Sequence, residues 1–329
     1  MPDISLKTLR EHGRQEIFLS LARVPNSSRV LCGASDGKVY DLDALAEKPE
    51  FKAHEGHGPF VTGVAVAGEV VVSGGYECKL IWRKLDGGEI VKTVENAHAR
   101  WLRKLAASPD GQRIASVADD MVCRIWDAQG GLIHELRGHD EQTPHHFPSM
   151  LYTCAFSADS AKLATADKTG RICLWDVSGG AKLAQLDGPG FYTWDPKQRI
   201  HSIGGTRAVA FSPDGNTLVA GGIGLIGNID HLDGPSRVEV FDLASGKSTH
   251  IFEGDAKGLV EHLAFHPEGK WLVALGGDNG GLIQFYDLAE KKVIKSDKAP
   301  MHVHAAALSE DGKQLFAAGH SKIVAWELT

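Results

Sequence analysis

The chain reads SPDG at residues 108–111 and RIWD at residues 124–127, and this pair of segments decides its fold. Proline at the second and glycine at the fourth position of SPDG suit a type I turn that joins antiparallel strands. Short apolar and β-branched runs flank these turns, as at residues 207–211 and 217–220, which is typical of strands. Because no helical periodicity of useful length is present, the sequence predicts an all-β protein.

The same pair recurs along the whole chain. The step from the turn to the closing aromatic residue is 18 residues here and again in SADS…CLWD, 17 in SEDG…VAWE and 20 in HPEG…QFYD. It grows to 29 in SPDG…EVFD, where the hairpin carries an insertion. The closing positions are Leu42, Trp82, Trp126, Trp175, Phe241, Tyr286 and Trp326. Their spacings of 40, 44, 49, 66, 45 and 40 residues indicate a repeat protein with seven units.

This pattern resembles the WD40-repeat family, and in particular its stand-alone, bacterial-type members. In that family a repeat of roughly 40 to 45 residues forms one four-stranded blade of a propeller. The resemblance covers essentially the whole chain and implies one seven-bladed β-propeller over residues 1–329. The expected blades are residues 13–53, 54–97, 98–138, 139–187, 188–253, 254–297 and 298–329.

The last repeat needs an outer strand, since three residues remain after Trp326. The segment LKTLREH at residues 6–12 parallels IHELRGH at residues 133–139, which is the outer strand of the third unit. We therefore expect residues 1–12 to complete the last blade. Such pairing would close the ring and remove its open edges.

A second group of residues could be mistaken for a catalytic triad. These residues are His98, Ser116, Asp120 and Trp126. In the resembled family the four positions form a buried hydrogen-bond chain from the indole through the hydroxyl and the imidazole to the carboxylate. We expect this structural role here. In the fourth repeat His139, Thr165 and Trp175 remain, and Thr169 is read in the place of the acid.

Composition excludes several classes of partner. The chain has 35 basic and 42 acidic side chains, a formal charge of −7 and no runs of one sign, which argues against nucleic acid or an anionic membrane. The charged start, residues 1–14, is unlike a signal peptide, and no apolar stretch approaches the roughly 18 residues of a membrane span. The five cysteines are scattered without a Cys-x-x-Cys pair. We expect a cytoplasmic protein.

The sequence gives little evidence for a metal site or a catalytic site. Among 16 histidines, His145-His146 and His302-x-His304 each offer two ligands, whereas structural zinc sites use four and catalytic ones three. The sequence fixes no third ligand, so we expect neither a metal nor another cofactor. No acid or histidine repeats at one position in every unit, so we expect no enzyme. An enzyme or a small-ligand or metal binder that uses the central channel remains the alternative.

Three insertions fall on one face of the expected propeller, in residues 139–157, 189–212 and 222–235. Long loops on a rigid scaffold are where function concentrates. Two of the insertions carry aromatic and basic residues of the kind found in binding hot spots. They include Met150, Phe191, Tyr192, Trp194 and Arg199. The alternative is that these side chains pack against the propeller and hold their own loops in place.

The resembled family also implies a binding face, through residues at the start of the first strand of a blade and before its tight second turn. Carried over by register, these positions add Phe60, Tyr76, Trp101, Arg103, Asp119, Tyr152, Lys168 and Arg207 to the predicted partner-binding set. We therefore expect a non-catalytic adaptor, a monomeric propeller within a complex, that holds a peptide or protein across the second to fifth repeats. A structural subunit of a larger assembly is the other alternative.

Overall fold

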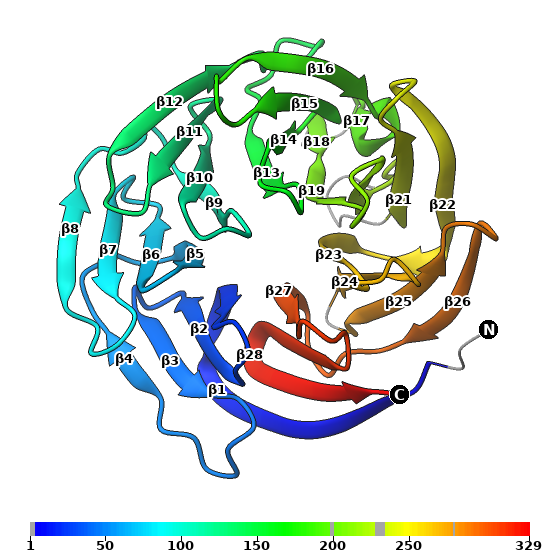
Figure 1. Cartoon of the computed structure of the whole chain (residues 1–329). Helices are drawn as coiled ribbons and strands as arrows, with labels where there is room; N and C mark the ends of the chain where they lie inside the picture. Colours follow the sequence, from blue (N-terminus) through cyan, green and yellow to red (C-terminus); the bar gives the residue numbers. More distant parts are fainter. Residues whose placement is uncertain (1–3, 198–200, 228–233, 279) are drawn as a thin grey trace.

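The computed structural model describes residues 4–197, 201–227, 234–278 and 280–329. Its antiparallel strands form a ring of sheets around a central axis (Figure 1). The fold is an all-β propeller, as predicted. The short 3-10 helix η1 (Pro189–Phe191) lies in an insertion. In the described part of the chain, no helix is long and apolar enough to cross a membrane.

Within the described residues, five four-stranded sheets follow one another around the ring, each running from the axis to the rim. The first contains β5 (Val61–Ala67), β6 (Val70–Gly75), β7 (Leu80–Lys84) and β8 (Ile90–Val94). The second contains β9 (Leu102–Ala107), β10 (Arg113–Ala118), β11 (Val122–Asp127) and β12 (Leu132–Arg137). The third contains β13 (Leu151–Phe156), β14 (Lys162–Asp167), β15 (Arg171–Asp176) and β16 (Lys182–Asp187). The fourth contains β19 (Thr206–Phe211), β20 (Thr217–Ile223), β21 (Pro235–Asp242) and β22 (Lys247–Lys257), and the fifth contains β23 (Leu259–Phe265), β24 (Leu272–Gly277), β25 (Leu282–Asp287) and β26 (Lys292–Asp297).

The sixth large sheet corrects the expected number of blades. It joins, in order, β27 (Val303–Leu308), β28 (Gln314–Leu328), β1 (Leu6–Arg23), β2 (Arg29–Ala34), β3 (Val39–Asp43) and β4 (Lys52–His54). The described strands thus form six sheets of four or more strands, not the seven separate blades predicted. The reason is that β1 and β28 run on for 18 and 15 residues without a break, so the strands expected for the first and last blades share one hydrogen-bonded sheet.

The N-terminal strand closes the ring in the way the sequence predicts. The first half of β1 pairs with the end of β28, with Leu6 opposite Leu328 and His12 opposite Ile323. Its second half pairs with β2, with Phe18 opposite Ala34. Figure 1 shows this strand, in blue, lying outside the red C-terminal strand. A single strand therefore links the two ends of the chain.

The Ser-Pro-Asp-Gly turns owe their shape to the serine and the aspartate. Ser108 Oγ donates to Asp110 Oδ1 over 2.5 Å and accepts from the backbone N–H of Arg113 over 2.9 Å. Gly111 takes a positive φ of 69° and donates its N–H to the Ser108 carbonyl over 2.8 Å. Ser157, Ser212 and Ser309 repeat the bond to the aspartate in their own turns.

The core lies between neighbouring sheets. The second and third strands of a sheet are covered on both faces, so nearly every residue of β10 and β14 is buried, not only every second one. The outer strand β8 is mostly exposed because it lies at the rim. Trp82 of one sheet meets Trp126 of the next edge to face, with 5.8 Å between ring centroids.

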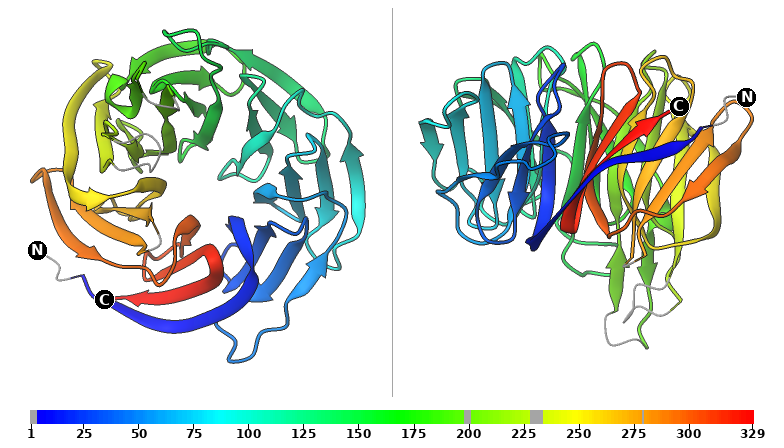
Figure 2. Two further views of the ribbon diagram at one scale, coloured as in Figure 1. Left: turned by 180° about the vertical axis from the view of Figure 1, so that it is seen from behind. Right: turned by 90° about the horizontal axis from the view of Figure 1, so that it is seen from below.

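One insertion builds a small sheet of its own from β17 (Tyr192–Trp194) and β18 (Ser202–Gly204). Seen from the side, lime-green segments of this part of the chain project beyond one face of the disc (Figure 2). The expected insertion at 222–235 lies in the hairpin between β20 and β21, and the structure describes it only in part.

Candidate functional site

The predicted binding positions meet in pairs at one end of the inner strands. The N–H of Tyr76 donates to the Phe60 carbonyl over 3.3 Å, and the N–H of Asp119 donates to the Trp101 carbonyl over 3.0 Å. The N–H of Lys168 donates to Met150 in the same way over 2.9 Å. In each pair, one residue directly precedes the innermost strand of a sheet and the other directly follows the second strand of the same sheet. The hairpin geometry therefore repeats from sheet to sheet and lines up these side chains around the axis.

Six of these residues form what we call the aromatic–arginine cluster. Its members are Phe60, Tyr76, Trp101, Arg103, Tyr152 and Arg207. Tyr76 stacks on Trp101 with 4.4 Å between centroids and 6° between ring planes. Phe60 lies 5.3 Å beyond Tyr76. Trp101 is 51% exposed and Phe60 is 42% exposed. A stack of large rings thus stands on the surface, held by its own members.

Arg103 links the stack to the next sheet. Its guanidinium donates two hydrogen bonds to Asp119, of 2.7 and 2.5 Å. It lies 5.6 Å from the ring centroids of both Trp101 and Tyr152. Burial lowers the pKa of Arg103, but the hydrogen bonds to Asp119 outweigh this and raise the pKa above its usual value. The guanidinium is therefore a fixed, charged platform between aromatic rings.

Arg207 is the second cation of the cluster. Its guanidinium lies over Tyr152, 3.6 Å from the ring centroid. Its Nε is buried and has no hydrogen-bond partner among the described residues. Nearby, Lys168 donates to the Pro148 carbonyl over 3.3 Å, and burial followed by the charge of Arg207 lowers the pKa of this lysine. Arg103, Arg207 and Lys168 therefore place three cations near the carboxylate of Asp119.

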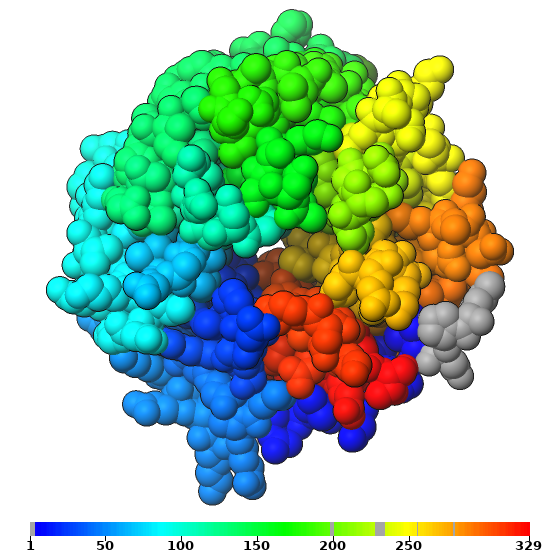
Figure 3. Space-filling view, viewed as in Figure 1, coloured from blue at the N-terminus to red at the C-terminus, as the bar shows by residue number. Residues whose placement is uncertain are grey.

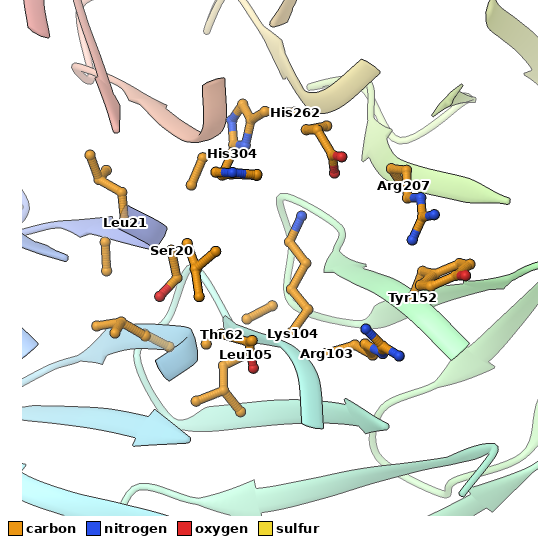
Figure 4. A pocket seen from close by; sticks show the side chains of 18 of the residues that line it. Ser20, Leu21, Thr62, Arg103, Lys104, Leu105, Tyr152, Arg207, His262 and His304 are labelled. Carbon is orange, nitrogen blue, oxygen red and sulfur yellow. The ribbon is translucent and has the colours of Figure 1, made fainter. Parts of the chain in front are cut away.

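Two hollows adjoin the cluster. A surface groove of about 410 Å³ is lined by Tyr76, Cys78, Ala99, Arg100, Trp101, Asp119, Pro148, Ser149 and Met150. A cavity of about 540 Å³ occupies the central channel, with Arg103, Lys104, Tyr152 and Arg207 among its lining residues. The ring is hollow at its centre (Figure 3), and Figure 4 shows the labelled side chains around the cavity. Sequence reasoning missed Arg100 and Lys104, although both adjoin predicted positions on the same inner strand or its entry.

The aromatic residues of the insertions form a second group. The ring of His145 stacks on Trp194 with 4.0 Å between centroids and 4° between planes. The hydroxyl of Tyr192 donates to Thr143 over 3.1 Å, which joins two insertions. A third joins them where the N–H of Ile226 donates to the hydroxyl of Thr193 over 2.9 Å. Tyr192 thus holds its loop, as the alternative reading expected, while Trp194 is 41% exposed.

Two predicted binding residues are placed unlike surface contacts. Phe191 is fully buried among core side chains, because the turn of η1 directs its ring inward beneath the guanidinium of Arg237, 5.3 Å away. It cannot touch a partner in this structure, so that prediction is wrong. Lys168 is 7% exposed, so it offers a partner little contact surface and would act on it through its charge. Arg199 lies outside the described residues.

The residues that resemble a triad lie inside a sheet. Trp126 Nε1 donates to Ser116 Oγ over 2.9 Å, and the hydroxyl lies 2.7 Å from His98 Nε2. His98 Nδ1 lies 3.1 Å from both carboxylate oxygens of Asp120. The hydroxyl and imidazole are buried, so no substrate reaches them. The arrangement connects strands and offers no nucleophile.

The next repeat keeps all four members of such a chain, which corrects one expectation. Trp175 Nε1 donates to Thr165 over 2.9 Å, and His139 lies 2.8 Å from that hydroxyl. The acid is Asp167, whose Oδ2 lies 2.7 Å from His139 Nδ1. Thr169 does not replace it; the Thr169 hydroxyl donates to Asp167 over 2.7 Å. The carboxylate comes from two residues earlier in the turn than the register suggested.

A partial chain that sequence reasoning missed lies in the sheet before these. His57 contacts the carboxylate of Glu77 and lies 2.7 Å from Ser73 Oγ. The sequence signal was the Gly56-His57 pair upstream of Ser73, which parallels the Gly138-His139 pair. The structure also places Glu261 beside His302 and His304, which supplies the third potential ligand that the sequence did not fix.

Comparison with known proteins finds similarity in several repeats of the chain. The family model described as "WD domain, G-beta repeat" matches residues 88–127, 130–176 and 246–287. The chain is 23% identical over 250 residues to a guanine nucleotide-binding protein subunit beta-like protein of Encephalitozoon cuniculi, covering 73% of this chain and 69% of that protein. It is 26% identical over 213 residues to eukaryotic translation initiation factor 3 subunit I of Candida albicans, covering 61% and 52%.

Other relatives are much longer than the matched region. Apoptotic protease-activating factor 1 of Homo sapiens is 28% identical over 187 residues, which is 56% of this chain and 12% of that protein. The chain likewise spans 21% of the human WD repeat and SOCS box-containing protein 1, with 31% identity over 100 residues. The similarity to these relatives therefore covers only a small part of their length.

Proposed function

Because the chain is a WD40-repeat protein with a propeller fold, we propose that it is a non-catalytic platform that binds a protein or peptide segment at the aromatic–arginine cluster. The observation that carries this proposal is the exposed stack of Tyr76 on Trp101 beside a groove. Exposed aromatic rings and arginines at the centre of a surface are typical of binding hot spots. Neighbouring side chains hold the stack, so little side-chain entropy is lost when a partner covers it.

The charges around the groove suggest what kind of segment binds. Arg103 is matched by Asp119, whereas Arg207 keeps an unpartnered Nε and Lys168 adds a further positive charge. An incoming carboxylate would complement this excess. We infer that the segment carries an acidic residue next to an apolar or aromatic one. The apolar side chain would enter the groove against Trp101 and Met150, and the carboxylate would meet Arg207.

The test begins with a peptide selected from a random displayed library on the intact protein, whose affinity is then measured by fluorescence anisotropy. Trp101→Ala and Arg207→Ala should each weaken binding by about tenfold or more, since hot-spot truncations cost about 2 kcal/mol. The matched control is Leu132→Ala, which removes a 49% exposed side chain from the outer strand β12.

Folding is checked by the melting temperature of each variant, which should stay near that of the parent because both substituted residues lie at the surface end of inner strands. Selected peptides that bind Trp101→Ala and Arg207→Ala as tightly as the parent would refute the proposed surface. Loss of binding in Leu132→Ala alone would move it to the rim.

A further inference from the structure

Three potential metal ligands meet on the wall of the central channel. Glu261 lies on β23, His302 directly precedes β27, and His304 lies on β27. One ligand atom from each residue falls within 4.8 Å of the other two. The two inner strands are neighbours in the ring (Figure 1), which explains why residues 41 positions apart converge. These three ligands are not part of the aromatic–arginine cluster, and the inference drawn from them does not depend on the proposed function.

The imidazoles of this group have unused nitrogens. Nε2 of His302 and Nε2 of His304 are buried, and neither has a hydrogen-bond partner among the described residues. A buried polar atom without a partner destabilises the fold, so two such atoms side by side are unusual in a native protein. A third imidazole adds to the crowding, because the ring centroid of His320 lies 5.1 Å from His302 and 5.0 Å from His304.

The histidines are suited to act as neutral ligands. Burial, followed by the charges of His302 and His320, lowers the pKa of His304 to about 3. Burial also lowers the pKa of His302. Neutral imidazole has a free lone pair on one nitrogen, which is the form that binds metals. Each unpartnered Nε2 is therefore free to bind a cation.

We propose that Glu261, His302 and His304 form a binding site for one divalent transition-metal ion, with zinc as the first candidate. Two imidazoles and one carboxylate are a known three-ligand set for zinc, which leaves coordination positions for water or another ligand. Imidazole favours zinc and similar ions over magnesium and calcium, which prefer oxygen. The ion would satisfy both orphaned nitrogens and neutralise the carboxylate.

The open side of this site faces the central cavity. Glu261 and His304 line the same cavity of about 540 Å³ as Lys104 and Arg207. Figure 4 shows Lys104 extending into the cavity from one side, with His262 and His304 on the other. The positive charge of Lys104 interacts with Glu261 and would oppose a metal cation held there. Lys104 therefore provides a test of where the ion binds.

The histidine pair at residues 145 and 146 does not compete as a site. Both side chains are exposed on an insertion, and His145 is engaged in the stack with Trp194. The structure groups neither of them with a third ligand in the described part of the chain.

The experiment titrates the untagged, metal-free protein with Zn²⁺ by isothermal calorimetry. We expect one ion per chain, and we expect His304→Ala and Glu261→Gln each to weaken binding by more than about tenfold. The control His134→Ala removes a histidine of the outer strand β12 and should leave the affinity unchanged. Equal affinity in parent, His304→Ala and Glu261→Gln would overturn the site, because the zinc would then sit on other histidines.

Two further measurements guard against variants that fail to fold. Co²⁺ added to the parent protein should give visible absorption bands of low-coordinate cobalt that Zn²⁺ abolishes, and a spectrum of hydrated Co²⁺ would count against the site. Lys104→Met should tighten Zn²⁺ binding, since a nearby cation is removed. Unchanged or weaker binding by Lys104→Met would place the ion away from this wall.

Discussion

At the scale of single residues, one hydroxyl joins three parts of a sheet. Ser116 accepts a hydrogen bond from Trp126 of β11 and contacts His98 in the loop before β9. Indole N–H is a donor only, so it depends on this acceptor once it is buried. The chain from tryptophan to aspartate is therefore a device for holding strands and loop together.

Removing that hydroxyl should cost stability. Ser116→Ala leaves the Trp126 indole and the His98 imidazole without their shared partner, and we expect the free energy of unfolding to fall by about 1–3 kcal/mol in urea titrations. Ser178→Ala, which removes an exposed serine hydroxyl bonded to Asp176, is the control and should change it little. If the two variants were equally stable, the hydrogen-bond chain would have no structural role.

A second residue predicts a response to acid. Burial raises the pKa of Asp41, but hydrogen bonds from Arg29 and His54 outweigh this and lower the pKa from 3.8 to about 2. Because the folded pKa is the lower one, Asp41 stabilises the protein above about pH 4 and loses this effect as the pH falls through 2.

Asp41→Asn should therefore lower the free energy of unfolding by about 2 kcal/mol at pH 7, and the difference from the parent should shrink between pH 4 and pH 2. Urea denaturation at a series of pH values measures it. A difference that is the same at pH 7 and pH 2 would show that Asp41 acts through packing and not through its charge.

At the scale of elements, the single strand β1 pairs with two different strands, β28 and β2. Its N-terminal half covers the edge of β28, and its C-terminal half starts the pairing with β2. An uncovered β28 would present a long open edge with the closing residue Trp326 beneath it. The closure of the ring therefore depends on a segment at the far end of the chain.

Deleting residues 2–12 should lower the melting temperature of the whole propeller in calorimetry. The deletion removes the backbone pairing between β1 and β28 and leaves the edge of β28 open. The control is Lys7→Ala, which breaks an exposed ion pair with Glu327 of 3.1 Å and should leave the melting temperature unchanged. A truncated protein that keeps the full melting temperature would show that pairing with β28 does not latch the ring.

At the scale of the whole molecule, the repeated turns made the propeller predictable and the long strands hid its division into sheets. Ser-Pro-Asp-Gly specifies a turn by its own hydrogen bonds, so those hairpins could be read from the sequence. No such turn marks the points where β1 and β28 pass from one partner to the next, so two expected blades proved to be one sheet.

Some residues of the candidate site could be predicted from the sequence and others could not. Positions such as Trp101 and Tyr152 were predictable because the hairpin register carries over between repeats. Phe191 was not, since composition cannot tell which way a side chain points in an insertion. Glu261 was not either, because its meeting with His302 depends on contact between two strands that are distant in sequence.

The central claim, that the aromatic–arginine cluster holds a partner segment, is tested most directly by hydrogen–deuterium exchange with and without the selected peptide. We predict slower exchange in the segments that contain Trp101, Tyr152 and Arg207, because the peptide would cover the entries to these inner strands. Exchange should stay the same in the outer strands β8 and β12. Protection confined to outer strands, with none at the three inner positions, would contradict the account.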